Sequence, residues 1–190
     1  CTFCNFCRKK NDNDTYVTSL EEYRSKIKEL MSLGGDQLLL QGGMNPALDL
    51  SYYANLFRTL KSEFPGLKLH ALGPPEVVYL AAHEGLSVRH VLEKLREAGL
   101  DSLPGAGAEI LSDRVRKIVS PAKATTSEWL GVMREAHKMN LPTSATMMFG
   151  HAENDEERMR HLIVLRDLQN ERPDGNWGFI SFIPWPFQDE

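Results

Sequence analysis

Short apolar runs and amphipathic helical stretches alternate along this 190-residue chain, and no other feature constrains its fold as strongly. Each apolar run is bounded by glycine, proline or polar residues and is short enough to be a buried strand. The five predicted strands span 37–41, 67–71, 101–103, 143–149 and 178–183. Because parallel strands are joined by helical crossovers, the alternation predicts an α/β protein with a parallel sheet, either doubly wound or a (β/α) barrel.

The predicted helices are placed by the signals at their ends. Ser19 with Glu22, and Thr125 with Glu128, each have the spacing of a capping box. Helices are expected to begin at Ser19, Ser51, Pro74, Thr125 and Asn154. The stretch that begins at Pro74 is expected to stay helical as far as Gly99. Four histidines in helical segments are expected on helix surfaces: His83, His90, His137 and His161.

Composition excludes several classes of protein. The chain carries 22 Lys and Arg against 26 Asp and Glu, a net charge of −4, and 42% of its residues are hydrophobic. These values are typical of a globular domain and argue against disorder or a disulfide scaffold. The mild acidity gives no support for a nucleic-acid partner. No apolar run approaches the roughly 18 to 20 residues that a membrane-spanning helix needs.

All three cysteines lie within the first seven residues, as Cys1, Cys4 and Cys7. Clustering brings thiolates to one point, as a metal requires, whereas a disulfide framework spreads its cysteines along the chain. An iron–sulfur cluster held by three thiolates, with one iron open for a ligand, suits this count better than a four-ligand zinc site. A zinc-binding structural module is the alternative from a different class of protein.

Polar and glycine-rich segments follow the predicted strands at their carboxyl ends. They are Gln41–Asn45, His70, Gly105–Glu109 and Gly150–His151. Both candidate folds place ligand sites at this edge of the sheet. The sequence therefore predicts a ligand site built from these loops.

The segment from Cys1 to Phe6, together with a strand that ends in Gly42-Gly43, resembles the radical S-adenosylmethionine (SAM) superfamily. Longer segments are similar to the dehypoxanthine futalosine cyclases of menaquinone biosynthesis: 39–46, 69–76, 105–111, 145–151 and 182–188. The resemblance implies a partial (β/α) barrel of about five parallel strands.

Two related families resemble the chain as well. Synthases of the deazaflavin precursor of F420 share the segments at 105–111 and 145–151. They typically carry His at the position of Asn45 and Leu at the position of Trp185. Aminofutalosine synthases diverge more around the glycine pair. These differences favour the cyclase over the F420-precursor synthase and the aminofutalosine synthase, which are kept as alternatives.

The cysteine spacing is one residue shorter than the superfamily pattern C-x3-C-x-aromatic-C. In the overlay that needs no gap, Cys1 and Cys4 match the second and third cluster ligands, and Cys7 falls on an aromatic position. The first ligand would then lie four residues before Cys1. Residues 1–190 are accordingly expected to be part of a radical SAM core domain, truncated at both ends and inactive alone. In the alternative register, all three cysteines form the triad.

The resemblance implies a [4Fe–4S] cluster and SAM as cofactors, and it suggests residues for each. The implied cluster ligands are Cys1 and Cys4, with Cys7 only in the alternative register. The implied SAM-binding residues are Phe3, Gly42, Gly43, Glu109 and Arg114. The implied substrate-binding residues are Gln41, Asn45, His70, Glu76 and His151. Glycine would let the backbone approach SAM, and an arginine could pair with its carboxylate.

The resemblance also implies a reaction. A radical derived from SAM removes a ribose hydrogen from dehypoxanthine futalosine, and the sugar radical then closes onto the aromatic ring. The implied partners are this small nucleoside-derived substrate and a reductant such as flavodoxin or ferredoxin. Because such clusters degrade in oxygen, a reducing cytoplasm is expected.

Overall fold

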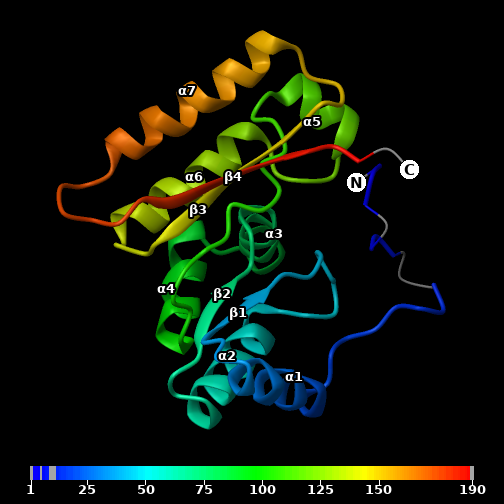
Figure 1. Ribbon diagram of the computed structural model, residues 1–190, viewed down its shortest axis with the longest axis vertical. Helices are drawn as coiled ribbons and strands as arrows, with labels where there is room; N and C mark the ends of the chain where they lie inside the picture. The colour runs from blue at the N-terminus through cyan, green and yellow to red at the C-terminus, as the bar shows by residue number, and fades with distance from the viewer. Residues whose placement is uncertain (1, 5, 9–11, 189–190) are drawn as a thin grey trace.

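The computed structural model describes residues 2–4, 6–8 and 12–188. Helices and strands alternate along these residues (Figure 1). The helices are α1 (Leu20–Ser32), α2 (Leu50–Glu63), α3 (Pro74–Glu84), α4 (Val88–Ala98), α5 (Asp113–Val119), α6 (Thr126–Lys138) and α7 (Asp155–Glu171). The strands are β1 (Gln37–Leu40), β2 (Lys68–Ala71), β3 (Thr143–Phe149) and β4 (Phe179–Pro186).

The strands pair in parallel and in chain order. β1 pairs with β2, from Gln37 opposite Lys68 onward, and β3 pairs with β4. The predicted strand at 101–103 is reduced to two parallel bridges, Ser102 to His70 and Leu103 to Thr143, which join the two pairs. Chain order without reversal differs from a doubly wound sheet, in which the order reverses at a switch point. The fold is therefore a partial TIM-like α/β arrangement.

Most predicted helix starts are confirmed, and one predicted helix is wrong. Capping boxes stand at Ser19, Thr125 and Asn154. The expected helix from Pro74 to Gly99 is two helices, because Gly85 has a φ of +66° and ends α3 in the left-handed conformation that favours glycine. Ser87 then caps α4 by accepting a hydrogen bond from the backbone amide of His90.

The main hydrophobic core lies between the sheet and helices α2, α3, α4 and α6, which pack on one another. Its largest fully buried side chains include Phe57, Leu69, Leu95 and Trp129. A second, smaller cluster lies at the carboxyl end of β3 and contains Ile110, Val115, Val119 and Met147, with Phe3 packed against it. This cluster contacts the first described residues of the chain, which lie near the end of β4 and α5 (Figure 1).

Two of the four helical histidines are buried, so the expectation that all lie on helix surfaces is wrong for them. The Nδ1 atom of His161 accepts a hydrogen bond from the backbone amide of Leu111 at 3.0 Å. The Nε2 atom of His137 lies 2.8 Å from the hydroxyl of Thr143. Burial lowers the pKa of each histidine to about 4, so both are neutral at pH 7. His83 and His90 are exposed, as expected.

The two paired strands β3 and β4 differ in how the molecule covers them. β3 is buried along its length, with only Phe149 half-buried. β4 is exposed from Ile180 to Pro186, including the large side chains of Phe182, Ile183 and Trp185. None of the helices in the described part of the chain has the length and apolarity to cross a membrane.

Candidate active site

The glycine-rich loop after β1 is fixed by a carboxylate from α3. Glu76 accepts hydrogen bonds from the backbone amide of Gly42 at 3.0 Å and from that of Gly73 at 2.6 Å. Glu76 is buried, and burial raises its pKa, although the two amide hydrogen bonds act against the rise. A Cβ atom on Gly73 would lie 2.9 Å from that of Ala106, so only glycine fits there. Glu76 therefore links the loop after β1 to the loop after β2. The second of these loops lies against the loop at 104–107, where Gly73 meets Ala106.

Glu109 follows the loop at 104–107, and its side chain is buried. It is 4% exposed, and its φ of +46° is unusual for a residue with a side chain. Its carbonyl oxygen accepts a hydrogen bond from the backbone amide of Met148 in β3 at 3.0 Å. Lys123 donates to its Oε1 atom at 3.1 Å and is the only described residue that hydrogen-bonds this carboxylate. The strained backbone and the buried acid mark this loop as a candidate functional site.

Arg116 supports the Glu109 loop from inside. Its guanidinium donates to the carbonyl oxygens of Gly107 and Ala108 at 2.9 and 2.7 Å, and it also donates to the carbonyl oxygen of Ala124. Burial lowers the pKa of Arg116, and the nearby negative charge of Glu109 opposes that change. One buried cation therefore holds the loop before Glu109 and the loop that carries Lys123 in a fixed relation.

The N-terminal segment lies against the same place. The backbone amide of Thr2 donates to the carbonyl oxygen of Val119 at 3.0 Å. The ring of Phe3 meets that of Phe187, just beyond β4, edge to face at 6.4 Å, and the Lys123 ammonium lies 5.9 Å from the Phe3 ring centroid. The segment that carries the cysteines is thus placed beside Glu109, at the carboxyl ends of β3 and β4.

Two of the three cysteines can be described. Cys4 is half-buried and Cys7 is exposed, both thiols are free, and the backbone amide of Cys7 donates to the Cys4 carbonyl oxygen at 3.2 Å. Cys1 lies outside the described residues. Over 2–4, 6–8 and 12–188, no three Cys, His, Asp or Glu side chains form a group that could hold a metal ion. The thiols nonetheless fit an iron–sulfur cluster by donor type, and Cys4 follows Phe3, whose ring lies 5.9 Å from the Lys123 ammonium.

His151 lies near Phe187 after β3. Its Nδ1 atom accepts a hydrogen bond from the backbone amide of Ala152 at 2.7 Å, so in the neutral ring the proton is on Nε2, which donates to the Met148 carbonyl oxygen at 2.9 Å. Its ring packs edge to face on Phe187 at 5.9 Å. Both ring nitrogens are therefore engaged by the backbone.

Glu153 holds the loop that carries His151. It accepts from the backbone amides of Gly150 at 2.6 Å and His151 at 3.0 Å, and from Arg158 at 2.8 Å. Burial alone would raise the pKa of Glu153, but these hydrogen bonds outweigh it and lower the pKa to about 2. Glu153 is therefore an ionised structural acid.

Arg114 lies apart from the other predicted SAM-binding residues. It is on α5, its side chain is 54% exposed, and its Nε atom donates to Glu157 at 2.8 Å. A second nitrogen donates to the carbonyl oxygen of Ala152. In this arrangement the guanidinium is directed to α7 rather than to the Glu109 loop.

The remaining predicted residues lie on the β1 and β2 side. The Nδ1 atom of His70 is 2.7 Å from the hydroxyl of Ser102, and burial lowers the pKa of His70. Asn45 uses its Oδ1 atom to accept a hydrogen bond from the backbone amide of Ala47 at 3.0 Å. Gln41 and Gly43 are exposed, and a Cβ atom on Gly43 would meet nothing within 4 Å. The β1 loop therefore has an open surface at Gly43.

Two residues of this site were not assigned from the sequence. Lys123 comes from the connection between α5 and α6, which follows no strand and so carried no signal for a site. Phe187 belongs to a segment that supports the family resemblance, but its contacts with Phe3 and His151 depend on the fold. The structure thus gathers Phe3, Glu109 and His151 through two residues that the sequence pattern left aside.

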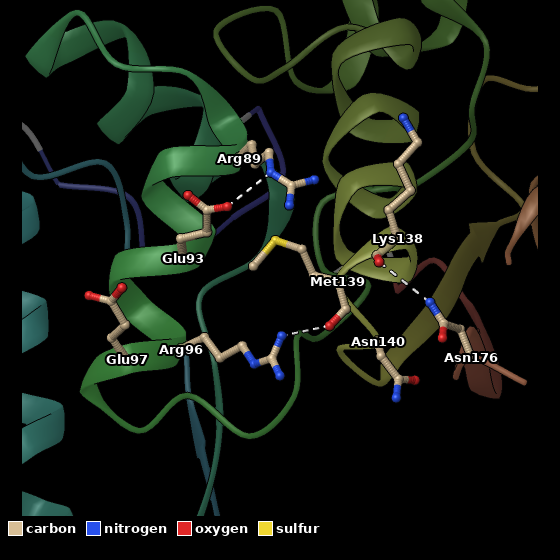
Figure 2. Close-up of a pocket in the computed structure, with 8 residues that line it drawn as sticks. All are labelled: Arg89, Glu93, Arg96, Glu97, Lys138, Met139, Asn140 and Asn176. Carbon is tan, nitrogen blue, oxygen red and sulfur yellow. Dashed lines mark hydrogen bonds and ion pairs between the residues drawn. The ribbon is translucent and has the colours of Figure 1, made fainter.

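A hollow of about 370 Å³ lies on another part of the surface (Figure 2). It is lined by one side of α4, the end of α6, the turn before β3 and Asn176 before β4, so it stands at the amino ends of β3 and β4. Its polar groups pair with one another: Arg89 with Glu93 at 2.9 Å, and Arg96 with the Met139 carbonyl oxygen at 2.7 Å. These contacts join helices and turns, and the hollow has no part in the candidate site.

Comparison with known proteins identifies the superfamily to which the chain belongs. Residues 1–164 match the radical SAM superfamily, and the chain belongs to that superfamily. Its members are enzymes that use a [4Fe–4S] cluster and SAM, act on small molecules and need a reductant. The superfamily agrees with the cysteine segment and with the position of Glu109 at the carboxyl ends of the strands.

Individual relatives narrow the comparison. The chain is 41% identical over 184 residues to 5-amino-6-(D-ribitylamino)uracil–L-tyrosine 4-hydroxyphenyl transferase 1 of Methanosarcina barkeri, covering 97% of the chain and 48% of the relative. It is 41% identical over 187 residues to the transferase of Methanothermobacter thermautotrophicus, covering 98% and 50%. It is 40% identical over 187 residues to the FO synthase of Mycobacterium leprae, covering 98% and 21%. The chain thus spans about half the length of the transferases.

These relatives overturn the futalosine cyclase prediction and its place in menaquinone biosynthesis. Their names refer to hydroxyphenyl transfer and to synthesis of FO, the F420 precursor. The cyclase was preferred on the residues at two positions, Asn45 and Trp185. Asn45 forms a local turn, and Trp185 lies on the exposed strand β4. Identity spread over the whole chain outweighs two such positions.

Proposed function

We propose that the protein transfers the 4-hydroxyphenyl group of L-tyrosine to 5-amino-6-(D-ribitylamino)uracil, as a radical SAM enzyme that makes the F420 precursor. The observation that carries this proposal is identity of 40–41% over nearly the whole chain to relatives named for that transfer or for FO synthesis. In this proposal residues 1–190 are part of the radical SAM core domain. The oxygen sensitivity of the cluster favours a reducing cytoplasm.

The proposed cofactor residues surround the Glu109 loop. When bound, the reduced cluster and SAM supply an organic radical that starts the reaction. Cys4 donates a thiolate to the cluster, with Cys1 as a second ligand and Cys7 as a ligand in the alternative register. Glu109 accepts hydrogen bonds from the ribose or ammonium group of SAM, and Phe3 covers the site against water. Support comes from the short distances that connect Phe3, Lys123 and Glu109.

The remaining assignments concern SAM and the substrates. Gly42 and Gly43 leave room for the methionyl part of SAM, because a Cβ atom on Gly43 would meet nothing within 4 Å and one on Gly42 would meet only Oε1 of Glu76, at 3.9 Å. Gln41, Asn45 and His70 are the proposed substrate contacts on the β1 and β2 side. Glu76 and His151 act less directly, since both are engaged by backbone groups and so shape the loops around the substrate.

The test uses the full-length enzyme, reconstituted anaerobically with iron and sulfide and supplied with SAM and dithionite. We expect L-tyrosine labelled with ¹³C in the ring to give a product that combines the labelled hydroxyphenyl group with the uracil, detected by mass spectrometry. Dehypoxanthine futalosine, offered in place of both substrates, should give no cyclised product. Absence of the labelled adduct with a fully loaded cluster would contradict the proposal.

A further inference from the structure

Lys123 has no role in any of the assignments above, yet its side chain lies where three parts of the site meet. Its ammonium is 3.1 Å from Oε1 of Glu109 and 5.9 Å from the centroid of Phe3. Its positive charge also acts on Glu76, where it opposes the rise in pKa that burial causes. Lys123 therefore contacts Glu109 and the aromatic ring next to Cys4, and its charge also acts on Glu76, the acid that holds the β1 loop.

The backbone around Lys123 is fixed on both sides. Its own amide donates to the carbonyl oxygen of Ser120 at 3.0 Å. The carbonyl oxygen of the next residue, Ala124, accepts from the buried Arg116 guanidinium at 2.8 Å. Because Arg116 also holds the carbonyl oxygens before Glu109, the Lys123 loop and the Glu109 loop cannot separate without breaking a buried set of hydrogen bonds. The 3.1 Å contact is thus set by the fold rather than by a flexible surface side chain.

The chemistry of the two contacts suits a residue that orients others. An ammonium has three donors and no acceptor, so it can bond Glu109 and still interact with the face of an aromatic ring. Lys123 is mostly covered, with 23% of its side chain exposed, which strengthens both interactions relative to an exposed pair. Glu109 is thereby held in one orientation, with Phe3 held over the same cation.

We propose that Lys123 is a positioning residue that aligns the Glu109 carboxylate with the cysteine segment through Phe3, so that SAM and the cluster meet in the required geometry. This inference rests on the proposed role of Glu109 in binding SAM. It does not depend on which substrates the enzyme joins. Lys123 itself need not touch SAM, because its effect is carried by Glu109 and Phe3.

The test compares four variants of the full-length reconstituted enzyme. K123M removes the charge but keeps the length of the side chain, K123R restores a cation, and K117M makes the same change at an exposed lysine of α5. We measure the SAM dissociation constant without reductant. We also record the electron paramagnetic resonance (EPR) spectrum of the reduced cluster with and without SAM. Iron and sulfide contents and the unfolding temperature are controls.

K123M is expected to raise the SAM dissociation constant about tenfold and to weaken the SAM-induced change in the EPR spectrum, as loss of one charge-assisted contact predicts. K123R should return the constant to within about threefold of the parent, and K117M should match the parent. K123Q, the fourth variant, keeps a donor but no charge, and its SAM dissociation constant should lie between those of K123M and K123R.

Two results would overturn the inference. One is SAM binding and an EPR change in K123M or K123Q equal to those of the parent. The other is a K123R variant as defective as K123M, since a purely structural role would not be rescued by charge. Neither measurement involves tyrosine or the uracil, so failure of the proposed hydroxyphenyl transfer leaves this test intact.

Discussion

Glu76 and Glu109 are both buried acids near the carboxyl ends of strands, but the chain holds them in opposite ways. Both oxygens of Glu76 accept backbone amides, from Gly42 and Gly73, and the residue lies in the first turn of α3. Glu109 has a left-handed backbone, and among the described residues Lys123 alone hydrogen-bonds its carboxylate. An acid saturated by amides holds loops together, whereas an acid held by a single cation keeps acceptor capacity for a ligand.

The first prediction separates the two acids by activity. E109Q keeps the size of the side chain but removes its charge, so a ligand hydroxyl or ammonium loses a charge-assisted partner. We expect kcat/KM for SAM in the full-length enzyme to fall roughly 100- to 1,000-fold, with the unfolding temperature nearly unchanged. Steady-state kinetics with varied SAM measure this. The exposed E29Q variant on α1 is the matched control and should be indistinguishable from the parent. Parental kinetics for E109Q would remove Glu109 from the site.

The loop that follows Glu109 also makes the unfolding free energy depend on pH. The loop after Glu109 is held by the neutral ring of His161, which accepts the Leu111 amide. The folded-state pKa of His161 is about 4, below the ordinary value of 6.5. Between these values the unfolded chain binds a proton that the folded chain does not, so the unfolding free energy falls as pH drops from about 6.5 to about 4. The loss for His161 is roughly 3 kcal/mol, with a similar contribution from buried His137.

Urea unfolding at pH 7 and pH 5 tests this dependence. H161N keeps an oxygen that can accept the Leu111 amide but cannot be protonated, so it should remove about half of the slope. H83N changes an exposed histidine of α3 and should leave the slope as it is in the parent. Equal slopes for the parent and H161N would mean that His161 does not hold the Glu109 loop through its neutral ring.

The sequence predicts the helices and strands around this site better than the side-chain contacts within it. Capping residues and apolar periods identify five helix starts and place β3 at 143–149, because those signals are local, but they miss α5 and merge α3 with α4. The burial of His161 depends on Leu111, fifty residues away, so helical spacing wrongly assigns it to the surface. Arg114 shows the same limit: its spacing from Glu109 suggests a shared ligand, but its guanidinium pairs with Glu157 of α7. The pattern of strands and helices gives no indication of Lys123 or Phe187, because their contacts form only when loops from separate strands come together in the fold.

The last prediction concerns the acid that holds loops. In E76Q one oxygen can still accept an amide, but the side-chain NH₂ group must face the other amide donor. We expect the unfolding free energy to fall by about 2 kcal/mol, because a buried donor loses its acceptor. Gly42 moves with this link, so SAM affinity should weaken less than tenfold, far less than in E109Q. Urea unfolding and SAM titration of the same preparation measure both quantities, with E29Q again as control. A variant that binds SAM poorly at parental stability would make Glu76 a ligand residue and end the distinction between the two acids.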